Sequence, residues 1–335
     1  MAIHRSGGFA PRWKDAAGRS GFRVREVDGY GSDVMRHLDG CDALLWHLNQ
    51  DESVDLEHAR SILFSAEAAG MRVFPNGATC WHFDDKVAQK YLLEAIGAPL
   101  AKTWVYFSKE EALSFLDTAT YPLVFKLRRG AGSMNVRLVR DQRQGASLAN
   151  RMFTRGLNPH PPIEGLRRAA VRAMSTSKDR RLRFDRVWRV LKRLVAQTTG
   201  AQRERGYVLF QEFVPENNHD IRATVIGDRC FVFRRDVRPN DFRASGSGKI
   251  SYYREMQVPR DAVELAFSIS RRLGFQSMAY DFVRSPDDGR LILLEISFVF
   301  NADAVAGCPG YFDSDGNWIP GSVWPEEAIL EDLLS

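Results

Sequence analysis

The first hundred residues alternate short apolar runs with stretches of helical periodicity, and this alternation strongly limits how the chain can fold. Strand-like runs are "FRVREV" at 22–27, "DALLWHL" at 42–48 and "MRVFPN" at 71–76. A helical pattern over about 54–69 ends at Gly70, a residue that commonly terminates helices. Alternating strands and helices predict a small parallel sheet of the doubly wound, Rossmann-like kind.

A different pattern follows the helix predicted at 84–99. Strand-like runs and one helix fill residues 103–139, and a second strand-rich region covers 207–300 with a helix at 261–274. This pattern predicts two α+β lobes after the α/β domain. The expected division is a Rossmann-like domain at 1–101, an N-lobe at 102–206 with a basic helical insertion at about 145–206, and a C-lobe at 207–335 carrying the metal site.

Composition indicates a soluble globular protein. The chain is 44% hydrophobic and 27% charged, and no apolar run approaches the roughly 18 residues of a membrane helix. The N-terminus lacks the apolar core of a signal peptide. The four cysteines are far apart and form no CxxC pair, which disfavours a disulfide framework or a zinc cluster and favours a reducing cytoplasm.

The positive charge is concentrated in one segment. Residues 151–205 contain 15 Lys or Arg and four acids, a net +11, so the rest of the chain carries −6 of the overall +5. Such a segment can bind an acidic polymer, an anionic membrane face or an acidic substrate, or it can be a solvated insertion. A basic pI that comes from one segment does not indicate a specific nucleic-acid partner.

A carboxylate stands inside the apolar run "LILLEISFVFN". Side-chain alternation predicts that Glu295 and Ser297 share a strand face with Leu293 and Val299. Asp281 lies in another apolar run, "MAYDFV", and the turn "SPDDGR" joins the two as a hairpin. Two buried carboxylates side by side require a cation. Mg²⁺ suits them, and pairing of each acid with an arginine is the alternative.

Two further clusters are weaker when taken alone. Lys126 ends an apolar run and is followed by the glycine-containing turn "RRGAGS", which can present backbone N–H groups to phosphates or be a simple hairpin. The segment "VLFQEFVPENNHDIRATVIGD" reads as an ordinary strand, loop and strand. Lys86, at the start of a helix, reads as a solvated surface residue.

Together and in this order, these clusters resemble the ATP-grasp superfamily, nearest to the RimK-like carboxylate–amine ligases. The similarity runs from about Pro75 to Ala306 through six pieces, among them "PLVFKLRRGAGSMNV", "FRRDVRPNDFRASGSGKI" and "LLEISFVFN". The tail "CPGYFDSDGNWIPGSVWPEEAI" more loosely resembles ATP-grasp proteins of polysaccharide and cell-surface gene clusters.

The resemblance implies an ATP site between two α+β lobes behind a Rossmann-like domain, with ATP and Mg²⁺ as cofactors. Lys86 and Lys126 would contact phosphates under the loop of Gly130, Gly132 and Ser133. Glu212 and Val214 would meet adenine through their backbone, with Phe213 between them, and Asp220 or a nearby polar residue would hold the ribose. Asp281 and Glu295 would bind Mg²⁺, and Arg243, with Arg222 as a companion, would face the γ-phosphate or the substrate carboxylate.

Two positions depart from the family pattern. Ser297 and Ser245 stand where the family has Asn. A hydroxyl can ligate Mg²⁺ but is a weaker acceptor than an amide oxygen. Asn301, six residues from Glu295 and therefore of the same strand parity, is the candidate to supply the missing oxygen.

The implied function is an ATP- and Mg²⁺-dependent ligase that joins a small-molecule carboxylate to an amine through an acylphosphate. Such proteins are expected in cell-surface polysaccharide or peptide modification. Two alternatives stay open: an ATP-grasp kinase acting on a hydroxyl, and a non-catalytic nucleotide-binding regulatory protein in which Ser297 marks lost catalysis. The sequence does not define the substrates or the oligomeric state.

Overall fold

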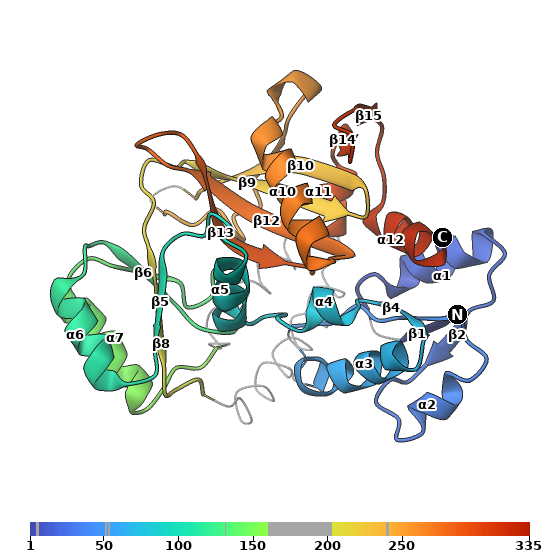
Figure 1. Ribbon diagram of the computed structural model, residues 1–335, viewed down its shortest axis with the longest axis horizontal. Coiled ribbons are helices and arrows are strands. Elements are labelled where there is room, and N and C mark those ends of the chain that lie inside the picture. Colours follow the sequence, from blue (N-terminus) through green and yellow to red (C-terminus); the bar gives the residue numbers. More distant parts are fainter. Residues whose placement is uncertain (5–6, 51, 53, 131, 160–202, 239–240) are drawn as a thin grey trace, which may run out of the picture. The chain divides into compact units, whose positions relative to one another are not determined.

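A computed structural model describes the chain except for residues 5–6, 51, 53, 131, 160–202 and 239–240 (Figure 1). The chain divides into two compact units. The first unit comprises Met1–Ala101 and Val214–Ser335, and the second comprises Lys102–Phe213. Each unit has its own sheets and is described separately below.

The N-terminal part of the first unit contains the expected parallel sheet. Its strand order is β2-β1-β3-β4, formed by β1 (Ala2–His4), β2 (Arg25–Val27), β3 (Ala43–Leu45) and β4 (Arg72–Phe74). The helices between and after these strands are α1 (Ala10–Arg19), α2 (Val34–His37), the π-helix η1 (Asp55–Ala59), α3 (Arg60–Ala68) and α4 (Gly77–Cys80). The sequence prediction of a parallel sheet is confirmed, although the three-residue strand β1 was missed.

The C-terminal part of the first unit contains a seven-stranded antiparallel sheet. Its order is β13-β12-β9-β10-β14-β15, with β11 also paired to β10. The strands are β9 (His219–Ile226), β10 (Arg229–Asp236), β11 (Ile250–Tyr252), β12 (Ser277–Arg284), β13 (Leu291–Ser297), β14 (Gly310–Asp313) and β15 (Trp318–Pro320). The helices of this part are the 3-10 helix η2 (Glu255–Gln257), α10 (Arg260–Leu273), α11 (Ala302–Ala306) and α12 (Pro325–Leu334). Helix α5 (Lys86–Ala95) comes from the N-terminal segment and packs against β13.

Helix α10 covers one face of this large sheet because its apolar residues recur at helical spacing. Ala262, Val263, Ala266, Phe267 and Ile269 are buried on that side of the helix. The helix ends at Gly274, whose φ of 68° is the left-handed conformation that glycine adopts without strain. The same hydrophobic cluster includes residues of both sheets of the first unit, so the two sheets share a core.

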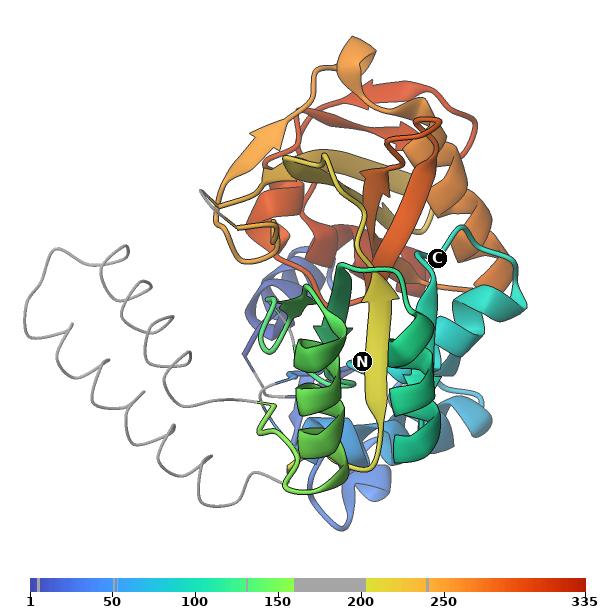
Figure 2. The same ribbon diagram turned by 90° about the vertical axis from the view of Figure 1, so that its left-hand side faces the viewer.

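The second unit is built on a four-stranded antiparallel sheet of order β5-β8-β6-β7. Its strands are β5 (Thr103–Tyr106), β6 (Leu123–Lys126), β7 (Arg137–Val139) and β8 (Val208–Glu212). Helices α6 (Lys109–Thr118) and α7 (Gln142–Phe153) lie side by side on this sheet (Figure 2). Each begins with a side-chain cap: Ser108 Oγ accepts from Glu111 N, and Asp141 Oδ1 accepts from Gln144 N.

Two predicted boundaries need correction. Residue 207 was the expected start of the C-lobe, yet β8 pairs with β5 and β6 and therefore belongs to the second unit. The basic insertion was expected from about residue 145, but residues 145–153 form the body of α7. Residues 160–202, which make up most of the Arg-rich stretch, lie outside the described residues. The predicted anionic partner of this stretch therefore stays a prediction.

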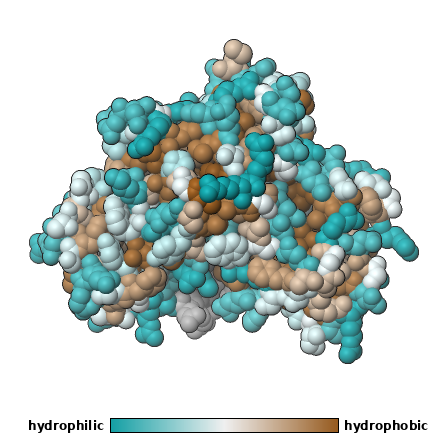
Figure 3. All heavy atoms as spheres, viewed as in Figure 1, coloured by the Kyte–Doolittle hydropathy of each residue, from teal (hydrophilic) through white to brown (hydrophobic). Residues whose placement is uncertain are grey.

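The surface shown in Figure 3 is hydrophilic over much of its area, with smaller hydrophobic areas between. Within the described part of the chain, no helix combines the length and the apolar character required to cross a membrane. All four cysteines are free thiols.

Candidate functional site

The charged residues predicted on the hairpin gather on one face of the large sheet. Strands β12 and β13 are antiparallel, and Asp281 is the register partner of Glu295. On the other side of β12, Asp281 is the register partner of Arg222 of β9. Three adjacent strands therefore place Glu295, Asp281 and Arg222 in one row, as predicted for the two carboxylates.

A β-bulge in β13 changes which of its side chains share a face of the sheet, compared with the prediction from the sequence. The register shifts after the pair Asp281–Glu295, and Phe282 is already opposite Leu293. Leu293 and Ile296 are consequently buried, whereas Glu295 and Ser297 are half-buried on the opposite face. The prediction that Glu295 shares a face with Leu293 was wrong, because a bulge reverses the alternation of side chains.

Asp281 is held by two arginines. Its Oδ1 accepts from Arg222 Nε at 2.7 Å, and its Oδ2 accepts from Arg222 Nη2 at 2.8 Å. Arg235 of β10 also lies 2.8 Å from Oδ2. Burial alone would raise the pKa of Asp281, but the two guanidinium groups outweigh it and hold that pKa well below its ordinary value.

Arg235 links Asp281 to a second buried acid. Its Nε donates to Asp220 Oδ1 at 2.8 Å, and its Nη2 contacts Asp220 Oδ2. Burial would lower the pKa of Arg235, but Asp281 and Asp220 together raise it above its ordinary value. Asp220, Arg222, Arg235 and Asp281 thus form a compensated cluster of two acids and two bases. Asp220, expected at the ribose, is buried in this cluster.

The sequence interpretation did not include Arg235. It follows Phe231 and Phe233 at two-residue spacing in "RCFVFRRDV", and both phenylalanines are buried. The alternation therefore places Arg235 on a buried strand face, where an arginine requires an acidic partner. That spacing was the signal in the sequence that could have identified it.

Glu295 pairs with Lys86 rather than with an arginine. Asp85 caps α5 by accepting from Ala88 N, and α5 packs against β13. This places Lys86 Nζ 3.1 Å from Glu295 Oε1. The Lys86 side chain is 9% exposed and that of Glu295 is 32% exposed. The interpretation of Lys86 as a solvated surface residue was wrong, because the start of α5 faces the sheet.

The remaining candidates of the first unit have local partners. The Ser297 hydroxyl donates to the Val299 carbonyl at 2.8 Å. Strand β13 ends at Ser297, so the strand-parity argument for Asn301 was wrong; Asn301 instead caps α11 by accepting from Asp303 N. Arg243 donates from Nε and Nη2 to Asp241, and the pKa of Asp241 is lowered because these bonds outweigh its burial.

In the second unit, Lys126 is the buried last residue of β6, and the predicted glycine turn follows it. Gly130, Gly132, Ser133 and Asn135 all have positive φ. Residues of positive φ in a turn can direct backbone N–H groups toward an anion. The turn is tied down by Asn135 Nδ2, which donates to the carbonyls of Asn158 and Pro159 at 3.0 Å.

The predicted adenine segment falls where the two units divide. Glu212 ends β8, and its backbone N–H donates to the Lys102 carbonyl at 2.8 Å while its Oε1 accepts from Lys102 N at 2.8 Å. Phe213 is the last residue of the second unit, and Val214 is the first of the returning segment of the first unit. The adenine contacts of Glu212, Phe213 and Val214 stay predictions.

The carboxylate oxygens of the first unit fit a magnesium ion whose other ligands are water and phosphate oxygens. Among the described residues, no group of three or more His, Cys, Asp or Glu side chains is placed to hold a metal. Glu295 offers a partly exposed carboxylate, whereas both Asp281 oxygens already accept from arginine. Mg²⁺ commonly uses one or two carboxylates and completes its shell with water and phosphate oxygens.

Comparison with known proteins places this arrangement in a fold class. No family model matches the sequence. An ATP-grasp protein of the RimK type from Sphaerobacter thermophilus superposes with a TM-score of 0.56, at 15% identity and with both chains fully covered. The ATP-grasp ligase PsnB, solved with a minimal precursor, Mg and ADP, gives a TM-score of 0.53 at 13% identity, covering 99% of this chain and 96% of PsnB.

The fold is that of the ATP-grasp proteins, which confirms the fold expected from the resemblance in the sequence. A curated relative is the alpha-aminoadipate–LysW ligase LysX of Saccharolobus solfataricus, 22% identical over 259 residues, which cover 77% of this chain and 74% of LysX.

Proposed function

We propose that the protein is an ATP- and Mg²⁺-dependent ligase that joins a carboxylate to an amine. The observation that carries the proposal is the row of Glu295, Asp281 and Arg222 with Lys86 paired to its outer end. Such a row combines carboxylates for a metal with cations for phosphates on one rigid sheet. The enzyme class and the cofactors are supported by LysX, a ligase, and by PsnB, a ligase solved with Mg and ADP.

In this proposal Glu295 offers Mg²⁺ its carboxylate beside Asp281, with Ser297 as a further candidate ligand. The metal, when bound, neutralises phosphate charge. Lys86 and Lys126 contact phosphate oxygens, and the loop of Gly130, Gly132 and Ser133 donates backbone N–H bonds to them. Arg222 and Arg243 orient the γ-phosphate or the substrate carboxylate and stabilise the charge that spreads in the transition state.

The reaction proposed has two steps. A carboxylate oxygen attacks the γ-phosphorus, the bond from that phosphorus to the bridging oxygen of ADP breaks, and an acylphosphate forms. The amine nitrogen then attacks the acyl carbon, phosphate leaves, and the nitrogen loses a proton. Positioning and charge stabilisation by fixed Arg and Lys groups accomplish this chemistry without a serine or cysteine nucleophile.

Substrates are proposed at the level of chemical class. LysX is named for ligating α-aminoadipate and LysW, and PsnB is solved with a precursor. A free amino acid and a peptide or carrier protein are therefore the first pair of substrate classes to test. Peptide or cell-surface polysaccharide modification is the proposed setting, and it rests on the looser resemblance of the C-terminal tail.

The test is release of ADP by the purified full-length protein with ATP and Mg²⁺. The panel combines α-amino acids and acidic peptides as carboxylate donors with amino acids and amines as acceptors. The proposal predicts ADP release that requires one carboxylate and one amine together. ADP release that requires a hydroxyl compound and yields a phosphate ester would instead identify a kinase, and nucleotide binding without any turnover would identify a regulatory protein.

A further inference from the structure

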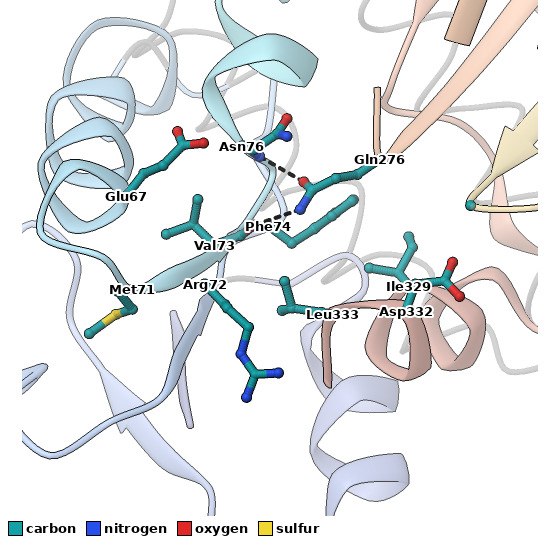
Figure 4. Close-up of a pocket in the computed structure, with 11 residues that line it drawn as sticks. Glu67, Met71, Arg72, Val73, Phe74, Asn76, Gln276, Ile329, Asp332 and Leu333 are labelled. Carbon is teal, nitrogen blue, oxygen red and sulfur yellow. Dashed lines mark hydrogen bonds between the residues drawn. The ribbon is translucent and has the colours of Figure 1, made fainter. Parts of the chain in front are cut away.

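One cavity of the first unit has no role in the proposed reaction, and no residue of the charged row lines it. It has a volume of about 430 Å³, within the range of small-molecule sites. Its walls come from α3, β4, the segment before β12, and α12, as Figure 4 shows. The lining residues are Glu67, Met71, Arg72, Val73, Phe74, Asn76, Gly227, Gln276, Ile329, Asp332 and Leu333.

The wall formed by β4 is fixed by Gln276. Its Nε2 donates to the Val73 carbonyl at 2.8 Å, and its Oε1 accepts from Asn76 N at 2.7 Å. Its own backbone N–H donates to Thr79 Oγ1 at 2.9 Å. Three hydrogen bonds from one residue hold the strand end and the start of α4 together, so the cavity is preformed and a ligand does not bear the cost of ordering it.

The floor of the cavity is apolar and its rim is charged. Phe74, Ile329 and Leu333 are buried residues of the floor and belong to one hydrophobic cluster. Glu67, Arg72 and Asp332 are exposed, and Figure 4 shows them around that floor. A site with this division favours a small molecule with one aliphatic part and one charged part.

The charged residues of the rim differ in how they are occupied. Within the described part of the chain, Arg72 makes no side-chain hydrogen bond or ion pair, which leaves its guanidinium available to a carboxylate. Asp332 is held through Oδ1, which accepts from Arg229 at 2.7 Å. Its Oδ2 packs against Gly227. A Cβ atom added to that glycine would lie only 2.2 Å from this oxygen.

We propose that this cavity binds an α-amino acid with an aliphatic side chain. The ligand carboxylate pairs with Arg72, its ammonium group is attracted to Asp332, and its side chain lies on Phe74, Ile329 and Leu333. A simple anion fits less well because two carboxylates line the rim. A simple cation fits less well because the guanidinium group of Arg72 also lines it. The site is separate from the proposed ligase chemistry, so its occupancy does not require ATP.

The test is calorimetric titration of the nucleotide-free protein with L-leucine. Its analogues are 4-methylpentanoate, which lacks the ammonium group, and 3-methylbutylamine, which lacks the carboxylate. We expect saturable binding of leucine and about tenfold weaker binding of each analogue, the loss of one charge-assisted contact. Arg72→Gln is expected to weaken leucine binding about tenfold, with partial recovery in Arg72→Lys.

The matched control is Arg36→Gln, which removes an exposed arginine of α2 outside the cavity and is expected to leave binding unchanged. Thermal melts establish that each variant is folded. Absence of leucine binding would overturn the proposal, and so would equal binding of leucine and its two analogues. Leucine binding that Arg72→Gln does not weaken would place the ligand elsewhere and overturn it too. None of these outcomes depends on ligase activity.

Discussion

Asp281 and Glu295 are register partners on β12 and β13, yet each carboxylate is paired with a different kind of cation. Asp281 is buried between Arg222 and Arg235, whereas Glu295 is partly exposed and pairs with Lys86. The two acids therefore have unequal roles in the structure: Asp281 belongs to a closed charge cluster, and Glu295 faces outward from it.

The closed cluster predicts a large effect on stability. Arg235→Gln should lower the free energy of unfolding by about 3–5 kcal/mol, because Asp220 loses its buried partner. The double variant Asp220→Asn with Arg235→Gln should lose less than the sum of the two single effects, since the charges act as a pair. Denaturant unfolding measures each value.

The control for this cycle is Arg290→Gln, an exposed arginine whose loss should have no measurable effect. Additive effects of the Asp220 and Arg235 variants would contradict the coupling.

The outward position of Glu295 predicts that metal and nucleotide bind together. Without nucleotide, Mn²⁺ used as a probe for Mg²⁺ should bind weakly, because both Asp281 oxygens accept from arginine. ADP supplies phosphate oxygens and should raise Mn²⁺ affinity at least about tenfold. Glu295→Gln should remove most of this gain, and Glu264→Gln, on the exposed side of α10, should not.

Electron paramagnetic resonance of free Mn²⁺ measures this affinity directly. Equally tight Mn²⁺ binding with and without ADP would show that the protein carries a preformed metal site and would contradict this prediction.

The serine at position 297 leads us to predict that an asparagine there would raise the affinity for metal. Its hydroxyl donates to the Val299 carbonyl, so only its lone pairs remain for a metal. Ser297→Asn offers an amide oxygen and should raise Mn²⁺ affinity in the presence of ADP by a few-fold. Ser297→Ala should lower that affinity, because the variant lacks the hydroxyl oxygen proposed as a ligand. An Asn variant that binds Mn²⁺ more weakly than the native protein would contradict the assignment.

A buried histidine predicts how stability varies with pH. His82 is 1% exposed, and burial lowers its pKa from 6.5 to about 4. Between these values the unfolded chain binds a proton that the folded chain does not, so stability falls as pH falls from about 6.5 to 4. The difference between the two pKa values corresponds to a loss of about 3 kcal/mol in the free energy of unfolding. Above pH 6.5 we expect no such dependence of stability on pH.

His82→Phe should reduce the slope of the stability profile over that interval by about half, because phenylalanine does not titrate whereas His47, whose pKa burial also lowers to about 4, still does. His37→Gln, at an exposed position of α2, should not flatten it. Identical slopes for the native protein and His82→Phe would show that His82 does not carry the effect.

The sequence predicted the general form of the fold because its periodicities are local. The parallel sheet, the hairpin that pairs Asp281 with Glu295, and the helix over 261–274 all follow from patterns within short windows. The bulge in β13 and the assignment of β8 to the second unit did not follow from such patterns. Both depend on which strand lies alongside, a choice made by contacts distant in sequence.

The candidate site was predicted in part for the same reason. Asp281 and Glu295 were recognisable because a carboxylate in an apolar run is conspicuous. Arg235 was missed because its partners, Asp220 and Asp281, stand 15 and 46 positions away in the sequence. The pairing of Lys86 with Glu295 depends on how α5 packs against β13, which the helix sequence alone does not encode.

The central claim is that this protein activates a carboxylate by phosphorylation. Once ADP release identifies a substrate pair, the donor is labelled with ¹⁸O in its carboxylate and the released phosphate is examined by mass spectrometry. We expect one labelled oxygen to pass to phosphate, because the acylphosphate breaks between carbon and the bridging oxygen. Unlabelled phosphate, or label retained entirely in the product, would contradict the claim.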